Sequence, residues 1–119
     1  MTFEPTQVGQ YRSILKELMD FKDNMLYQRN EEFTQEQLLT IRPQDVARWM
    51  CLKAYGTPDP APGDNPTHGR CSSLEYYKKA LSYFMPNRHN GWDEVTLRGN
   101  PTKSQEVLDV IKAVKKKEV

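Results

Sequence analysis

Residues 72–88 read SSLEYYKKALSYFMPNR and carry the clearest helical pattern in the chain. Ser72 is followed three residues later by Glu75, which predicts a capping box at the start of a helix. Pro86 predicts its end, because proline cannot continue the backbone hydrogen bonds. Apolar residues at i, i+3, i+7 and i+10 predict one apolar side of this helix, formed by Leu74, Tyr77, Leu81 and Phe84. Three neighbours widen that side: Tyr76, Ala80 and Tyr83. We predict that this helix is the centre of the fold.

Three further helices and a short turn are predicted around the central helix. The first helix is expected over residues 9–28 and the second over residues 43–56, and the last begins near Asn100. The short turn lies between the first two and is opened by a capping box of Thr34 and Gln37. The last helix is capped either by Asn100 or by Thr102 with Gln105. The expected buried residues are Tyr11, Leu15, Leu18, Met25 and Leu26; Val46, Trp49, Met50 and Ala54; and Val107, Val110, Ile111 and Val114.

The pattern predicts an all-α fold, a small orthogonal bundle of four main helices plus a short extra turn. The chain of 119 residues is short enough for a single domain over residues 1–119, with residues 1–8 as a loose lead-in. It has no apolar run of membrane-spanning length and no secretory signal at its start. Its two cysteines are too few for a disulfide framework. We therefore expect an intracellular protein, nuclear if the source is eukaryotic.

Two irregular connections interrupt the helices. Residues 57–71 hold four of the eight prolines and two of the six glycines, and a loop of this length is usually functional or mobile. Residues 87–99 surround Trp92, which we predict to plug the core, and a short hairpin is the alternative reading of this segment. Gly56 is expected to end the helix that precedes the first loop.

No catalytic or cofactor-binding pattern stands out. His68 and Cys71 are the only closely spaced pair of potential zinc ligands, and no second pair accompanies them. The glycines of residues 63–69 have the wrong spacing for a phosphate-binding loop. We therefore predict no metal, no cofactor, no small-molecule substrate and no enzymatic activity for this chain.

The charge is distributed unevenly along the chain. Residues 1–69 carry seven basic and ten acidic residues, a net charge of −3, whereas residues 70–119 carry ten and six, a net charge of +4. A basic half can present one basic face to DNA, although a merely solvated surface has the same composition. The start of the central helix offers backbone N–H groups suited to a phosphate. The residues expected to bind DNA are Arg70, Ser72, Ser73, Tyr76 and Lys79, with Lys103, Lys112, Lys115, Lys116 and Lys117 as backbone or linker contacts.

Three segments carry a resemblance to a known family. They are LTIRPQDVARWMCLKAYG at residues 39–56, SSLEYYKKALSYFMPNR at residues 72–88, and GNPTKSQEVLDVIKAVKKKEV at residues 99–119. Their order and spacing resemble the N-terminal core-binding domain of tyrosine recombinases of the phage-integrase type. The chain is also similar to the recombinase-like proteins of Crypton-type mobile elements. The likeness covers most of residues 10–119, although the loop at 57–71 is longer than in phage integrases and the first half is more acidic.

The resemblance implies a SAM-like helical bundle that clamps duplex DNA during recombination or integration, with other recombinase protomers as further partners. In that family the catalytic arginines, lysine, histidine and tyrosine lie in a C-terminal domain, so the resemblance implies that this chain does not catalyse the reaction. Residues 115–119 match the basic end that leads towards that domain. The alternative from another class is a helical bundle that binds a partner protein and not DNA.

Overall fold

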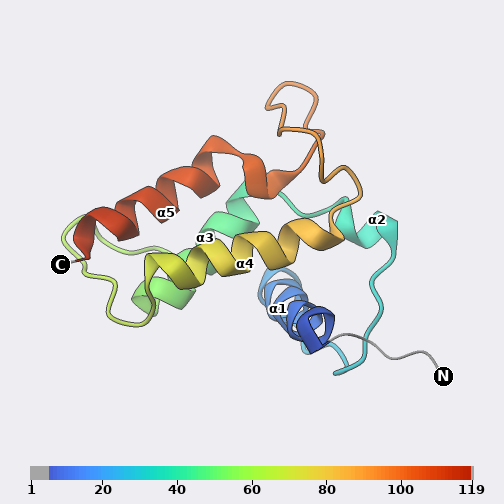
Figure 1. Ribbon diagram of the computed structural model, residues 1–119, viewed down its shortest axis with the longest axis horizontal. Coiled ribbons are helices and arrows are strands. Elements are labelled where there is room, and N and C mark those ends of the chain that lie inside the picture. Colours follow the sequence, from blue (N-terminus) through green and yellow to red (C-terminus); the bar gives the residue numbers. More distant parts are fainter. Residues whose placement is uncertain (1–5, 119) are drawn as a thin grey trace.

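The computed structural model of the protein describes residues 6–118 and confirms the all-helical prediction (Figure 1). Four main helices are accompanied by one short α-helical turn and one 3-10 turn. In this part of the chain the only β-type pairing is an isolated bridge between Asp93 and Arg98, and no helix is long and apolar enough to cross a membrane. The elements are α1 (Thr6–Asp23), α2 (Gln35–Leu38), α3 (Pro43–Tyr55), α4 (Cys71–Phe84), η1 (Pro101–Lys103) and α5 (Gln105–Lys117).

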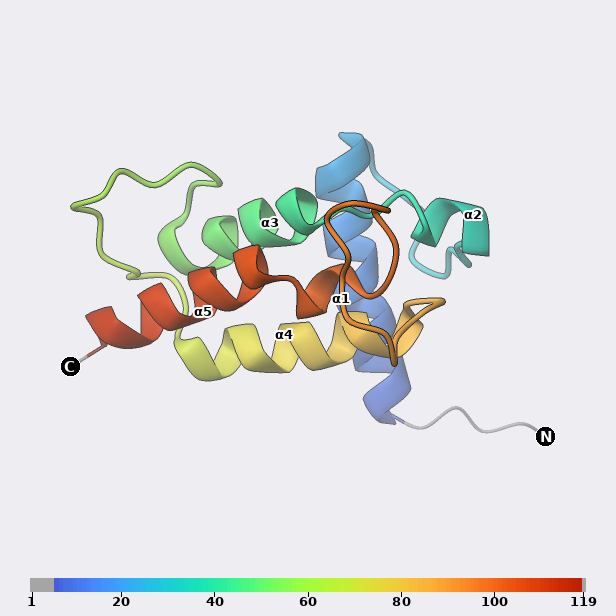
Figure 2. The same ribbon diagram turned by 90° about the horizontal axis from the view of Figure 1, so that it is seen from above.

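Helix α4 contacts each of the other main helices, as predicted for a central element. In Figure 2, α3, α4 and α5 lie alongside one another and α1 runs across them. Helices α4 and α5 run in opposite directions, so the end of α5 lies beside the start of α4. Six of the ten basic residues of the second half of the chain therefore lie on two neighbouring helices: Lys78, Lys79, Lys112, Lys115, Lys116 and Lys117.

The core forms from the apolar stripes that the sequence pattern identified. Leu81 of α4, Leu18 of α1 and Trp49 of α3 are all buried, as their helical spacing predicts, and α4 contacts both α1 and α3. Tyr77 packs against Trp49 with ring centroids 5.1 Å apart, but it remains half-buried, as does Phe84. The broad aromatic side of α4 is therefore only partly inside the core.

Helix α1 ends earlier than predicted, at Asp23 and not at Gln28. Asn24 adopts a left-handed conformation with φ of 51°, and the N–H of Met25 donates to the carbonyl of Asp20 at 3.2 Å. This geometry turns the chain away from the helix axis. Met25 and Leu26 are consequently 51% and 87% exposed, so the prediction that they belong to the core is wrong.

The N-terminal lead-in is also shorter than predicted. Helix α1 begins at Thr6, three residues before Gly9, so residues 6–8 are helical and not a loose lead-in. Residues 1–5, which complete the predicted lead-in, lie outside the described residues, as does Val119 at the end of the predicted basic segment.

The start of α2 and the end of α3 agree with the prediction. The side chain of Thr34 accepts from the N–H of Gln37, and the side chain of Gln37 accepts in return from the N–H of Thr34, so the predicted capping box starts α2. Gly56 ends α3 in the left-handed conformation with φ of 79°. A side chain is excluded there both by this backbone and by the ring of His68.

The caps of α4 and α5 differ from the prediction. Helix α4 begins at Cys71 after Arg70, so Ser72 lies inside the first turn and the predicted Ser72–Glu75 capping box is absent. Asn100 caps η1, and Ser104 caps α5 by accepting from the N–H of Val107 at 3.3 Å. The alternative cap of Thr102 with Gln105 is wrong because the 3-10 turn shifts the helix start.

The second irregular connection projects from the helices as a loop (Figure 1). Trp92 is half-buried and shares a cavity of about 40 Å³ with Leu38, Ile41 and Met85, so it closes the edge of the core without filling its centre. Val95 and Leu97 are exposed. Residues 87–99 were alternatively expected to form a short hairpin. Within this segment the only β-type pairing is the bridge between Asp93 and Arg98.

The proline-rich loop at 57–70 is attached to the helices at three points. Arg48 of α3 pairs with Asp59 at 3.0 Å, Lys117 of α5 donates to the carbonyl of Asp64 at 2.7 Å, and the N–H of His68 donates to the carbonyl of Ala54 at 2.9 Å. The Arg48–Asp59 pair is exposed and therefore stabilises the loop only weakly.

We expect the proline-rich loop to be the first segment that a protease cuts in the folded protein. Most residues between Ala61 and Asn65 are exposed, and few backbone hydrogen bonds protect them. Limited proteolysis with mass spectrometry would locate the first cut, and hydrogen exchange would report the protection of the same segment. First cuts within α3 or α4, with strong protection of the loop, would contradict this expectation.

Candidate nucleic-acid interface

One side of α4 faces solvent along its whole length. Ser72, Tyr76, Lys79 and Tyr83, at i, i+4, i+7 and i+11, are all exposed, and we call them the α4 outer face. Arg70 is exposed directly before it. Ser73, another predicted DNA-binding residue, is half-buried beside this face. The structure thus places three of the five residues predicted around this helix, Ser72, Tyr76 and Lys79, on one accessible face, and leaves Arg70 exposed just before the helix.

The start of α4 is not the open phosphate site that the sequence suggested. The N–H of Cys71 donates to the side-chain carboxylate of Glu118, which follows α5, and the N–H of Ser73 donates to the carbonyl of Arg70 at 3.0 Å. A carboxylate from the same chain therefore occupies the positive end of the helix. DNA contacts at α4 are expected from side chains and not from these two backbone groups.

Two tyrosines of the outer face are backed by a third tyrosine from α1. Tyr76 and Tyr83 are 36% and 45% exposed, and their rings meet the buried ring of Tyr11 edge-on with centroids 5.8 and 5.7 Å away. The hydroxyl of Tyr76 donates to Oε1 of Gln10 at 3.0 Å. The guanidinium of Arg88 lies 5.8 Å from the centroid of the Tyr83 ring.

Sequence reasoning missed Tyr83 and Arg88 as candidate site residues. Tyr83 was assigned only to the apolar side of the helix, although its spacing from Ser72, Tyr76 and Lys79 also fits the opposite side. That spacing was the available signal, but a tyrosine suits either environment because its ring is apolar and its hydroxyl polar. Arg88 lies beyond the helix end, where no helical period predicts its direction.

A groove runs between α4 and α5. Its volume is about 460 Å³, and its lining consists of Glu75, Lys78, Lys79 and Ser82 from α4 with Leu108 and Ile111 from α5. Lys112 and Lys115 follow Leu108 at i+4 and i+7, so they lie on the same side of α5.

The predicted lysines of the last helix do not all join this groove. Lys112, Lys115 and Lys116 are exposed on α5, and Lys103 is exposed on η1, at the opposite end of α5. Lys117 is half-buried, with its ammonium nitrogen bonded to the carbonyl of Asp64 and 5.1 Å from the Tyr55 ring centroid. Lys117 therefore fastens the proline-rich loop and is the predicted contact least available to DNA.

Positive charge is neutralised very differently in the two halves of the chain. Every ion pair between described side chains joins residues within positions 12–59, such as Lys16 with Asp20 at 2.6 Å and Lys53 with Glu17 at 3.2 Å. The ten basic residues from Arg70 to Lys117 form no ion pair with any carboxylate of residues 6–118. The surface of α4 and α5 thus combines a modest net charge with unpaired cations.

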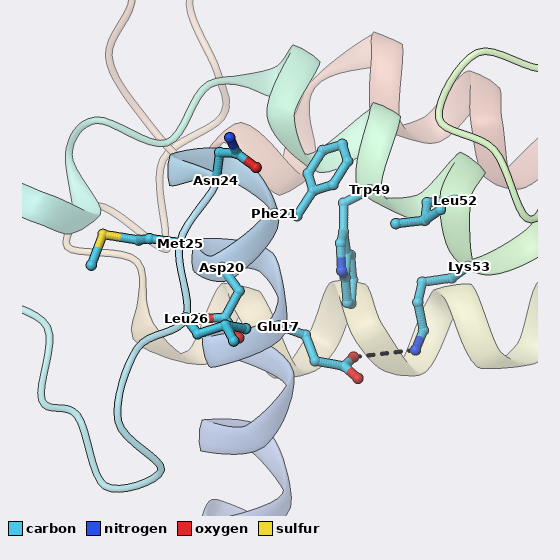
Figure 3. Close-up of a pocket in the computed structure, with 9 residues that line it drawn as sticks. All are labelled: Glu17, Asp20, Phe21, Asn24, Met25, Leu26, Trp49, Leu52 and Lys53. Atoms are coloured by element: carbon cyan, nitrogen blue, oxygen red, sulfur yellow. Dashed lines mark hydrogen bonds and ion pairs between the residues drawn. The ribbon is translucent and has the colours of Figure 1, made fainter.

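A second hollow lies between the ends of α1 and α3 (Figure 3). Its volume is about 600 Å³, and Phe21, Trp49 and Leu52 provide apolar parts of its lining. The exposed side chains of Met25 and Leu26 also line it. The ion pair of Glu17 with Lys53 spans the two helices beside Trp49 (Figure 3). More of its lining residues are apolar than in the α4–α5 groove, and its charged residues Glu17, Asp20 and Lys53 all form ion pairs.

The cysteines and histidines do not come together. Among residues 6–118, no three His, Cys, Asp or Glu side chains lie close enough to hold a metal ion. Cys51 and Cys71 are both free thiols. Burial raises the pKa of the Cys71 thiol, and the carboxylates of Glu75 and Glu118 raise it further. The Cys71 thiol is therefore protonated at neutral pH and a poor nucleophile.

Comparisons with known proteins identify no relative of this chain. No protein-family model, no curated protein and no solved structure matches the chain. The resemblance to the tyrosine recombinase family thus remains a hypothesis that rests on the three sequence segments.

Proposed function

We propose that this chain is a non-catalytic DNA-binding domain that grips duplex DNA with the α4 outer face and the lysines around the α4–α5 groove. Its role in recombination or integration, in the manner of the core-binding domain of a tyrosine recombinase, is part of the same proposal. The proposal also includes a SAM-like arrangement of the bundle and assembly with other recombinase protomers, as the resemblance implies.

The unequal neutralisation of charge carries this proposal. Both halves of the chain carry charges of both signs, but only in the first half are several of the cations held in ion pairs. On α4 and α5 the cations have no such partners among the described residues. Unpaired lysines and arginines are available to neutralise DNA phosphates and release their condensed counterions.

The shape of α4 suits this role. A helix fits the major groove of DNA, which is about 12 Å wide, and contacts bases with the side chains of its exposed face. Here that face offers a hydroxyl, an ammonium and two phenols in line. Arg70 and Arg88 lie beyond its two ends, where they suit contacts with phosphates.

Replacing Lys79 tests the proposal. We expect the folded protein to bind duplex DNA at low salt and to lose affinity steeply as salt rises. If Lys79 contacts a phosphate, Lys79→Ala should weaken binding to all sequences alike and make the slope of log affinity against log salt shallower by about one unit. Fluorescence anisotropy titrations over a range of salt concentrations would measure both effects.

The matched control is Arg48→Ala, which also removes one exposed positive charge but from the ion pair with Asp59 on α3. It should leave the salt slope nearly unchanged. Thermal melts of each variant would separate a loss of binding from a loss of folding. No binding to any continuous duplex at low salt by a protein shown to be folded would rule out a grip on duplex DNA.

The hollow between α1 and α3 favours a second candidate function, a protein-interaction bundle. Met25 and Leu26 are large, apolar and adjacent in sequence, and both are exposed at the edge of this hollow. If the folded chain fails to bind DNA, this surface becomes the better candidate site. In that case Leu26→Asp should abolish partner binding, whereas Lys79→Ala should leave it intact.

A further inference from the structure

We infer that the α4 outer face contacts unpaired bases, so that the preferred ligand is DNA in which a short single-stranded stretch interrupts the duplex. This inference rests on the proposed DNA-binding function and specifies its ligand. It starts from Tyr76 and Tyr83, which the duplex proposal uses only as polar side chains.

The two tyrosines present rings to solvent in the middle of a charged surface. Each keeps more than a third of its surface exposed, and each is supported from beneath by Tyr11. The hydrogen bond from Tyr76 to Gln10 further restricts its ring. Supported, exposed aromatic rings near cations are the usual platform on which unpaired bases stack.

The groove and the tyrosines lie along α4 on either side of Lys79. Lys78, Ser82 and Glu75 face the α5 side, whereas Tyr76 and Tyr83 face the α1 side, where they meet Tyr11. A single strand has its phosphates along one edge and its bases along the other. Its backbone can therefore follow the lysines of the α4–α5 groove while its bases turn onto the tyrosines.

The spacing of the tyrosines suits several bases in succession. Seven residues separate Tyr76 from Tyr83, which corresponds to about 10 Å along a helix. In double-stranded DNA, successive nucleotides of one strand are about 3.4 Å apart along the axis, so this distance covers about three base steps of a strand that keeps this stacked spacing. Arg88, next to the Tyr83 ring, adds a planar cation at the end of the row.

An intact duplex cannot use these rings in the same way, because its base faces are already stacked on one another. Only unpaired or displaced bases expose faces for stacking on a tyrosine. The basic residues are needed for either kind of DNA, since both carry phosphates. The tyrosines are therefore the residues that distinguish interrupted DNA from continuous duplex.

Three labelled DNA probes test the inference with the whole chain. They are a continuous duplex, the same duplex with about three unpaired nucleotides opposite a gap in one strand, and the unpaired strand alone. We expect the gapped duplex to bind at least about fivefold more tightly than the continuous one, since stacking of a single base on an aromatic ring corresponds to a factor of roughly 5 to 150 in affinity. The wild-type protein alone gives this result, so it does not depend on any variant folding.

Substitutions at the two tyrosines then locate the effect. Tyr76→Leu and Tyr83→Leu keep an apolar side chain but remove the aromatic face, and the pair should abolish the preference for the gapped duplex. Tyr83→Phe is the matched control, which keeps the ring and should keep the preference. Thermal melts would show that the variants remain folded.

The outcomes separate the two proposals. Equal binding of the gapped and the continuous duplex would overturn the contact with unpaired bases and leave duplex binding in place. The same conclusion would follow if the paired leucine variant kept the preference. Failure of all three probes to bind at low salt would instead overturn the DNA-binding function itself.

Discussion

Leu81→Ala is expected to lower the free energy of unfolding by about 2–5 kcal/mol. Leu81 is fully buried in the middle of α4, the helix that contacts all the other main helices. Removing its branched end leaves a cavity that the surrounding side chains fill only partly, because they are held by α1, α3 and α5. Urea or thermal denaturation followed by circular dichroism would measure the change.

The matched control for this prediction is Leu39→Ala, the same substitution at an exposed position. We expect it to change the free energy of unfolding by roughly 0.5 kcal/mol or less. Equal effects of the two substitutions would mean that α4 is not packed in the core and would contradict the architecture.

Asn100→Leu is expected to destabilise the protein by about 3 kcal/mol or more, although leucine has a similar volume. Asn100 is fully buried. Its amide nitrogen donates to Oγ of Ser82 at 2.8 Å and to the carbonyl of Arg88 at 3.1 Å, and its oxygen accepts from the N–H and the hydroxyl of Thr102. Leucine would leave several of these buried groups without partners, each at a cost of about 1–3 kcal/mol.

The same substitution at Asn30, which is exposed, provides the control. Chemical denaturation of Asn30→Leu should differ little from that of the wild type. A near-neutral result for Asn100→Leu would show that water replaces its hydrogen bonds. It would also refute the role of Asn100 in joining α4, the connection between α4 and η1, and η1 itself.

The candidate site was only partly predictable from sequence. Basic and hydroxyl residues grouped around one helix predict Arg70, Ser72, Tyr76 and Lys79 as site residues, and the structure exposes all four, the last three on one side of α4. Tyr83 and Arg88 were not identified, since a tyrosine near an apolar stripe fits the core equally well. The carboxylate of Glu118 at the start of α4 was not predictable either, because it comes from a residue 47 positions away.

The near-neutral composition does not indicate that the cations of the two halves differ in how many of them form ion pairs. The formal net charge of the chain is only +1. The two halves of the chain differ in which charges are paired, and ion pairs such as Lys53 with Glu17 join residues on different helices. Pairing across helices depends on their packing, so counts of charged residues cannot give it.

The sequence by itself determined the type, number and order of the helices. Local signals sufficed for this, as the Thr34–Gln37 capping box and the left-handed Gly56 illustrate, because each acts within a few residues of the chain. Leu74, Leu81 and Trp49 were likewise assigned to the core from helical spacing alone, and they are buried.

The tertiary structure alone decided where helices stop and which surfaces stay open. Met25 and Leu26 continue the apolar pattern of α1, yet the chain leaves the helix at Asn24 and exposes them. Tyr76 and Tyr83 are exposed because α1 covers only part of the aromatic side of α4, with Tyr11 between them. Helical period specifies the direction of a side chain around its own axis, but only the packing of neighbouring helices determines whether that direction meets protein or water.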